Sequence, residues 1–210
     1  MKLAIYSHCA LDTITIDGNS YEQIGGAASY CGIMARELKF DVDLFTKYGP
    51  DFPKQYLVEN KINLINSESN KNTTKFSISI SGSDRTLKLE NECDPIDYSD
   101  VDANGHIVSP IFHEISEDVF EKIKSNSNFL FVDPQGFLRQ KDSDNNIILK
   151  NTNLDLSGVN AIKINPEEGK NIVDGTPDEM MLALQKKGIE YVLLTDKVNV
   201  SLLVKNRIYS

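Results

Sequence analysis

The stretch "EQIGGAASYCGIMARELKF", Glu22 to Phe40, places two adjacent glycines directly before a segment with helical periodicity. Glycine loses more conformational entropy on folding than any other residue, so the pair Gly25 and Gly26 needs a physical reason. One reason is a sharp turn that lets the helix pack closely on its neighbours. The other is a bound molecule that lies against the bare backbone and accepts hydrogen bonds from N–H groups at the helix start. These residues alone leave both explanations open.

Two helices have clear sequence signals. In the first, the spacing predicts that one wide apolar stripe packs against the protein, formed by Tyr30, Met34 and Leu38 with Ala27, Cys31 and Ala35. The second is "TPDEMMLALQKKG", in which Thr176 is the predicted N-cap, Glu179 completes a capping box and Gly188 follows the end.

Short apolar runs that end in polar or turn residues alternate with these helical patterns. Such runs are typical of buried parallel strands, and they predict an α/β protein with a three-layer α/β/α arrangement. The runs are "KLAIYS" (2–7), "DVDLFT" (41–46), "HIVSP" (106–110), "NFLFVD" (128–133), "AIKIN" (161–165) and "EYVLLT" (190–195). At 210 residues the chain has room for one sizeable core, so we expect a single domain over residues 1–210.

Two segments do not fit this succession of strands and helices. In each, apolar and polar residues alternate strictly on both sides of a turn, which predicts a β-hairpin. Residues 74–91, "TKFSISISGSDRTLKLEN", place Phe76, Ile78 and Ile80 before an "SGSD" turn and Leu87 and Leu89 after it. Residues 12–24, "DTITIDGNSYEQI", alternate in the same way around "DGNS". We expect the two hairpins to pair into a small antiparallel sheet outside the main one, with one face free to cover a ligand.

The net charge limits the classes of binding partner, and the cysteine content indicates the cellular compartment. The formal net charge of -9 disfavours a nucleic-acid backbone or an anionic membrane, which leaves small molecules and proteins. No apolar segment is long enough for a membrane span or a signal peptide. Cys9, Cys31 and Cys93 are an odd number without a paired spacing, so we expect a cytoplasmic protein whose cysteines are small buried residues.

Several polar or glycine features come at the ends of strands, where open α/β sheets bind ligands. They are Asp12 after the first strand, Gly25 and Gly26 at the first helix, Asp133 after "NFLFV" and Asn165 after "AIKI". Asn165, Pro166 and Glu168 also fit an ordinary helix start, and Asp133 with Arg139 fits a turn and a surface ion pair. The three histidines are scattered, which disfavours a histidine metal site.

Taken in order, these motifs resemble the ribokinase-like (PfkB) family of carbohydrate kinases along nearly the whole chain. The matching pieces are "YSHCALDTI", "IGGAASYCG", the hairpin of residues 74–91, "FVDPQGFLR", "INPEE" and "YVLLTDKVNVSLLVKNRIYS". The resemblance implies a ribokinase-like fold in which residues 12–24 and 74–91 form a β lid. It also implies ATP-dependent phosphorylation of a hydroxyl on a sugar, nucleoside or cyclitol, with Mg²⁺. The oligomeric state stays open, although a lid face that is exposed and apolar on one side commonly pairs with a second copy, which favours a homodimer through the lid.

The resemblance assigns roles to individual residues. The substrate would be bound by Asp12, Gly25, Gly26, Tyr30, Asp133 and Arg139. The nucleotide and phosphate side would include Asn165, Glu168 and Thr195, with Glu168 holding Mg²⁺ through water.

The chain also departs from the family pattern. The second signature, Asp-x-x-Gly-Ala-Gly-Asp, which supplies the anion hole and the catalytic base, does not occur before Ser210. We therefore expect a domain without its C-terminal third, with no catalytic residue in the given chain and no turnover by that chain alone. The alternatives are an inactive sugar-binding or regulatory homologue and a nucleotide-binding α/β enzyme of another family, which would have no β lid.

Overall fold

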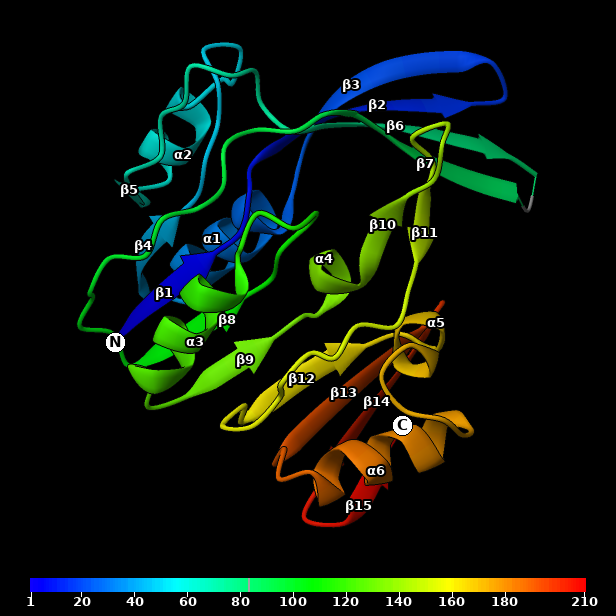
Figure 1. Cartoon of the computed structure of the whole chain (residues 1–210). Helices are drawn as coiled ribbons and strands as arrows, with labels where there is room; N and C mark the ends of the chain where they lie inside the picture. Colours follow the sequence, from blue (N-terminus) through cyan, green and yellow to red (C-terminus); the bar gives the residue numbers. More distant parts are fainter. Residues whose placement is uncertain (83) are drawn as a thin grey trace.

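A nine-stranded sheet forms the centre of the computed structural model, which describes residues 1–82 and 84–210 (Figure 1). Its strands, in spatial order, are β15 (Arg207–Tyr209), β14 (Asn199–Val204), β13 (Tyr191–Asp196), β12 (Ala161–Ile164), β9 (Leu130–Val132), β8 (Gly105–Val108), β1 (Lys2–Tyr6), β4 (Asp41–Phe45) and β5 (Asn63–Ile65). The strands from β13 to β5 are parallel, and β14 and β15 are antiparallel. All six predicted strands belong to the parallel part, and the late hairpin follows them.

Helices cover both faces of this sheet (Figure 1). They are α1 (Ala27–Glu37), α2 (Gln55–Glu59), α3 (Glu117–Ser125), α4 (Gln135–Leu138), α5 (Pro166–Lys170) and α6 (Pro177–Lys186). Because successive strand residues point to opposite faces, β1 contributes to two cores. Ala4 and Tyr6 pack in the core beneath α3 and α6, and Ile5 packs in the core beneath α1 and α2. These layers confirm the predicted α/β/α arrangement.

Helix α1 packs through small side chains, which include Ala35 and Cys31 of the predicted stripe but none of its large residues. Tyr30, Met34 and Leu38 are 56%, 60% and 64% exposed, whereas Ala28, Ser29, Gly32 and Ala35 are buried. The predicted stripe of large side chains was wrong because the helix lies too close to the sheet layer for them. A Cβ on Gly32 would already lie 3.0 Å from Ile62 Cδ1. The face that packs is therefore the face with the smallest side chains.

The two hairpins form one four-stranded sheet, which we call the lid. Its order is β3 (Asn19–Gly25), β2 (Ala10–Ile16), β6 (Lys75–Ser81) and β7 (Asp84–Asn91). Each hairpin is antiparallel, but the hairpins join through a parallel pairing of β2 with β6, which the alternation did not predict. Position 83, within the predicted "SGSD" turn, lies outside the described residues.

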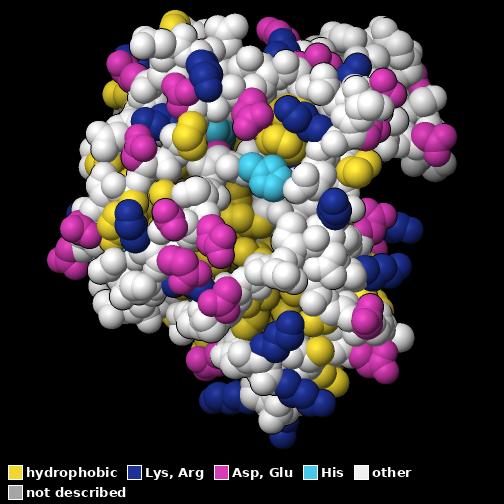
Figure 2. All heavy atoms as spheres, in the orientation of Figure 1, with side chains coloured by type: hydrophobic (Ala, Val, Ile, Leu, Met, Phe, Trp, Pro, Cys, Tyr) yellow, Lys and Arg dark blue, Asp and Glu magenta, His cyan; other side chains and the backbone are white. Residues whose placement is uncertain are grey.

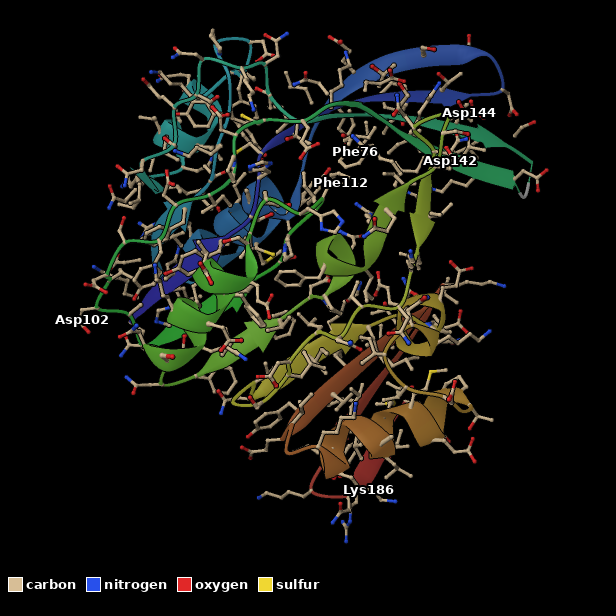
Figure 3. All side chains as sticks on the ribbon, viewed as in Figure 1. Phe76, Asp102, Phe112, Asp142, Asp144 and Lys186 are labelled. Carbon is tan, nitrogen blue, oxygen red and sulfur yellow. The ribbon has the colours of Figure 1, made fainter. Side chains whose placement is uncertain are left out.

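The base of the lid is fixed to the body by a small apolar cluster. Phe76 and Leu89 of the lid pack with Ile111 and Phe112 of the loop after β8. Figure 3 shows Phe76 and Phe112 close together beneath the lid. A two-stranded ribbon of β10 (Arg139–Lys141) and β11 (Ile147–Leu149) supports the lid from the side, where Leu89 N donates to Asn145 O at 3.0 Å. The lid is thus held above the carboxyl ends of the central strands.

Candidate functional site

The lid and the carboxyl edge of the sheet border a cavity of about 320 Å³. We call it the acceptor cavity after the substrate role that the sequence resemblance implies for its residues. In the space-filling view the lid overhangs the body and leaves a notch beneath it (Figure 2). Five of the predicted substrate residues line this cavity, namely Asp12, Gly26, Tyr30, Asp133 and Arg139. They come from β2, the start of α1, the end of β9 and the start of β10, so the fold brings together residues that are far apart in sequence.

Of these residues, Asp12 has the environment that most clearly indicates a binding site. Its Oδ1 is buried and has no hydrogen-bond partner among the described residues. Burial raises the pKa of its carboxyl from 3.8 to about 6, and a backbone hydrogen bond from Phe76 and the nearby positive charge of Arg139 partly oppose the rise. A buried carboxylate oxygen without a donor is costly, and a ligand hydroxyl would satisfy it.

The paired glycines are required by contacts within the chain. A Cβ on Gly25 would lie 2.0 Å from Asp12 Oδ2, so a larger residue there would displace the Asp12 carboxylate. Gly26 has a φ of +85°, and a Cβ there would lie 2.4 Å from His8 O. The tight-turn explanation therefore accounts for Gly26, and the Asp12 side chain accounts for Gly25. Gly26 also lines the acceptor cavity, and Gly25 acts on it through Asp12.

Tyr30 lies at the rim of the acceptor cavity. Its hydroxyl accepts a hydrogen bond from Gln23 Nε2 at 2.6 Å and donates one to Ile24 O at 3.2 Å. Gln23 lines the same cavity and is paired with Asp12 across the β2–β3 hairpin. Tyr30 thereby links α1 to the lid and holds an amide beside Asp12.

A second cavity of about 360 Å³ adjoins the first and is lined by Asn165, Glu168 and Arg139. We call it the donor-side cavity because the resemblance implies a role on the phosphate side for Asn165 and Glu168. Asn165 caps α5: its Oδ1 accepts from Glu168 N at 2.8 Å, and Glu168 Oε2 accepts from Asn165 N at 2.9 Å. Burial raises the pKa of the Glu168 carboxyl, and the nearby Lys163 ammonium opposes this shift. The capping explanation is thus correct, and it also fixes Glu168 at the cavity wall.

Lys163 determines how a cation would fit at this edge. Its Nζ lies 3.3 Å from Asp133 Oδ2 and 3.5 Å from Glu168 Oε2, between the two carboxylates. Among the described residues, no group of three or more His, Cys, Asp or Glu side chains is arranged to hold a metal ion. The Lys163 ammonium thus already lies between these two carboxylates.

One predicted site residue lies outside both cavities, and two residues that were not predicted line both of them. Thr195, near the end of β13, lines neither cavity in the described part of the chain. The sequence interpretation missed Arg85 and Gln135, which line both cavities. Gln135 had no distinguishing signal. Arg85 did have one, because it is in phase with Leu87 and Leu89 on the apolar face of its hairpin.

Glu114 was also missed, and it shapes the acceptor cavity from behind. It is buried, its Oε1 accepts from His8 N and Ile111 N at 2.9 and 2.7 Å, and its Oε2 accepts from Phe112 N at 2.7 Å. This carboxylate ties the end of β1 to the loop after β8. The role of Glu114 can be recognised only in the tertiary structure, since its partner His8 is far from it in sequence.

Comparisons with known proteins identify the fold. No protein-family profile and no curated protein sequence matches this chain. Solved structures do match. A pyrophosphate-dependent kinase of the ribokinase family, complexed with a pyrophosphate analogue and myo-inositol, is 17% identical with a TM-score of 0.84 over 99% of this chain and 77% of that chain.

Two further structures extend the likeness. Fructokinase from Halothermothrix orenii is 15% identical with a TM-score of 0.77, over 100% of this chain and 84% of that chain. Ribokinase from Arabidopsis thaliana, complexed with ribose and ATP, is 12% identical with a TM-score of 0.69, over 100% of this chain and 77% of that chain. The chain therefore has the ribokinase-like fold. Within the described residues, no helix is both long and apolar enough to cross a bilayer.

Proposed function

We propose that this chain, which has the ribokinase-like fold, serves a PfkB-type carbohydrate kinase that transfers a phosphoryl group to a hydroxyl of a sugar, nucleoside or cyclitol. The observation that carries the proposal is the unpartnered Oδ1 of Asp12 at the wall of a cavity covered by the lid. An ionised carboxylate there accepts hydrogen bonds from the hydroxyls of a polyol. The apolar side chains of Ile14, Ile78 and Leu87 on the same lid face suit the C–H face of a cyclic acceptor.

Phosphoryl transfer requires mainly positioning, charge stabilisation and exclusion of water. Asp12 and Gln23 would orient the acceptor, and the lid would keep bulk water from the donor. Arg139 and the Asn165–Glu168 cap lie on the donor side. No catalytic base is assigned among the described residues.

The donor in this proposal is ATP with Mg²⁺, which Glu168 would approach through water. Pyrophosphate is a second candidate, because the pyrophosphate-dependent kinase matches at a TM-score of 0.84 and the ATP-bound ribokinase at 0.69. A cytoplasmic location and a homodimer remain parts of the proposal. The homodimer would form through the cavity-facing side of the lid, which continues past the cavity to Ile16 and Tyr21, 39% and 48% exposed.

A thermal-shift panel of myo-inositol, ribose, fructose and adenosine tests acceptor binding. We expect at least one compound to raise the melting temperature, since a ligand that binds the native state stabilises it by mass action. Asp12→Asn should abolish that shift without lowering the melting temperature of the free protein. A panel in which no compound binds, or in which Asp12→Asn binds equally well, would contradict the proposal.

Turnover separates the kinase from its rival, an inactive sugar-binding or regulatory protein. The compound that binds is incubated with ATP and Mg²⁺, and separately with pyrophosphate and Mg²⁺, and the phosphorylated product is sought by mass spectrometry. Product formation supports the kinase. Tight acceptor binding that depends on Asp12, with no product from either donor, supports the binding protein.

A further inference from the structure

The acceptor and donor-side cavities share four lining residues, and two of them are arginines. Arg85, Leu87, Gln135 and Arg139 line both cavities, so the two cavities adjoin at these residues. In the proposed function, a phosphoryl group would move between donor and acceptor at this boundary. The charge of the two arginines therefore bears on what the boundary can hold.

Arg85 comes from the lid. It pairs with Ile80 across the β6–β7 hairpin and lies two residues before Leu87, on the apolar face that covers the cavity. Arg85 is exposed, so its guanidinium stays in contact with water while it borders both cavities. An anion held at that boundary would meet this charge.

Arg139 comes from the body and is held in one orientation. Its Nη1 donates to Ile111 O at 2.9 Å, and its Nη2 donates to Gln135 Oε1 at 2.7 Å. The guanidinium carbon lies 5.5 Å from the centre of the Phe76 ring at the base of the lid. A guanidinium has further N–H donors, and a fixed fork of this kind is suited to phosphate oxygens.

Neither arginine has an ion-pair partner in the described part of the chain. Across residues 1–82 and 84–210, no carboxylate lies within 4.0 Å of the Arg85 or Arg139 guanidinium. Burial lowers the pKa of Arg139, the more distant charges of Glu168, Asp133 and Glu114 oppose this shift, and the charge of Arg85 adds to it. The two cations repel each other, and an anion held between them would remove that repulsion.

We propose that Arg85 and Arg139 form a binding site for a tetrahedral oxyanion, with Arg139 fixed in the body and Arg85 brought by the lid. The identity of the anion rests on the proposed function, in which it is the phosphoryl group of the donor. The existence of the site does not depend on that function. Because one arginine belongs to the lid and the other to the body, an anion held by both would draw the lid toward the body.

Inorganic pyrophosphate is the probe for this site, titrated by calorimetry into the full chain in low-salt buffer without acceptor. Arg85→Gln and Arg139→Gln should each weaken binding by about tenfold or more, which corresponds to roughly 1.4 kcal/mol. Lys88→Gln is the matched control, since it removes the same charge from the same strand at a residue outside both cavities; it should change affinity by less than about twofold. Added salt should weaken binding to the wild type.

Three results would overturn the site: no pyrophosphate binding by the wild type, equal binding by Arg85→Gln, or an equal loss in Lys88→Gln. Circular dichroism of each variant shows whether it is folded. Should Arg139→Gln not fold, Arg139→Lys takes its place, with an expected loss because lysine keeps the charge but not the fork. Arg85 lies at the lid surface, so its variant tests the proposal independently of core stability.

A phosphate on the acceptor is the other possible source of the anion. Titration with fructose 6-phosphate into wild type and Asp12→Asn distinguishes the two. Pyrophosphate binding that is unaffected by Asp12→Asn supports the donor phosphoryl group. A sugar phosphate that binds more tightly than pyrophosphate and needs both Asp12 and Arg85 would overturn that identity. If an acceptor binds but pyrophosphate does not, only this anion site is contradicted. If pyrophosphate binds but no acceptor in the panel does, only the proposed kinase function is contradicted.

Discussion

At the scale of single residues, the site depends on a carboxylate that the fold keeps short of partners. Asp12 lies on a lid strand, and the hydrogen of Gly25 on the neighbouring strand leaves just enough space for its side chain. This arrangement raises the pKa of the Asp12 carboxyl to about 6, and the main cause is burial. Ligand binding and proton binding at Asp12 should therefore compete.

The pH dependence of acceptor binding follows from this pKa. The folded-state pKa of Asp12 is raised from 3.8 to about 6, so the free protein holds a proton there that the unfolded chain has lost. Its stability should fall as the pH rises from about 4 to about 6. Acceptor affinity should rise over the upper part of that range, because the ionised carboxylate accepts from hydroxyls. Calorimetry from pH 5 to 8 checks this, and Asp12→Asn should bind weakly with no such pH dependence.

A double-mutant cycle tests the contact between Gly25 and Asp12. Gly25→Ala should destabilise the protein by about 1–3 kcal/mol, because its Cβ would lie 2.0 Å from Asp12 Oδ2. In the Asp12→Ala background, where the carboxylate is gone, the same change should cost less than about 1 kcal/mol. Urea unfolding of the four proteins measures the coupling. Additive effects would show that Gly25 is needed for some other reason.

At the scale of elements, α1 shows how packing distance overrides periodicity. Large apolar residues recur at helical spacing on one face, but the helix lies against its neighbours with its small residues and leaves Met34 exposed. The distance is set by Gly26, whose positive φ brings the helix start close to the end of β1. A hydrophobic pattern predicts that a helix is amphipathic, and it predicts the buried face only where large side chains fit.

Substitutions on the two faces of α1 should therefore differ in effect. Gly32→Leu should destabilise the protein by about 1–3 kcal/mol, since the added side chain would meet Ile62, although leucine favours the helix more than glycine does. Met34→Gln should stay within about 0.5 kcal/mol, because Met34 is 60% exposed and both residues are good helix formers. Urea midpoints check both. A larger loss for Met34→Gln would contradict this packing.

At the scale of the whole molecule, the lid reaches beyond the cavity that it covers (Figures 1 and 2). The part near the body is anchored by the cluster around Phe76 and Phe112. The far part presents Ile16 and Tyr21 on the cavity-facing side, where they are 39% and 48% exposed. Two copies that paired there would bury this surface and would close each other's cavity from above.

Oligomeric state tests the pairing. Light scattering after gel filtration should give a dimer for the wild type, and Ile16→Asp should shift the mass to a monomer because a charge in an apolar interface is costly. Val198→Asp is the control, since Val198 is 94% exposed in the β13–β14 turn, away from the lid. A wild-type monomer, or dissociation by both variants, would contradict a lid-mediated dimer.

The sequence by itself determined the strands, the capped helices and the two hairpins, because these depend on local periodicity, capping and turn residues. It also brought Asp12, Asp133 and Asn165 to one edge, since parallel strands end together. Only the tertiary structure decided which face of α1 is buried, that the hairpins join in parallel, and that Glu114, Lys163 and Arg85 act at the site. The physical reason is distance: packing separations, unsatisfied atoms and unpaired charges arise only when segments far apart in the chain come within a few ångströms of each other.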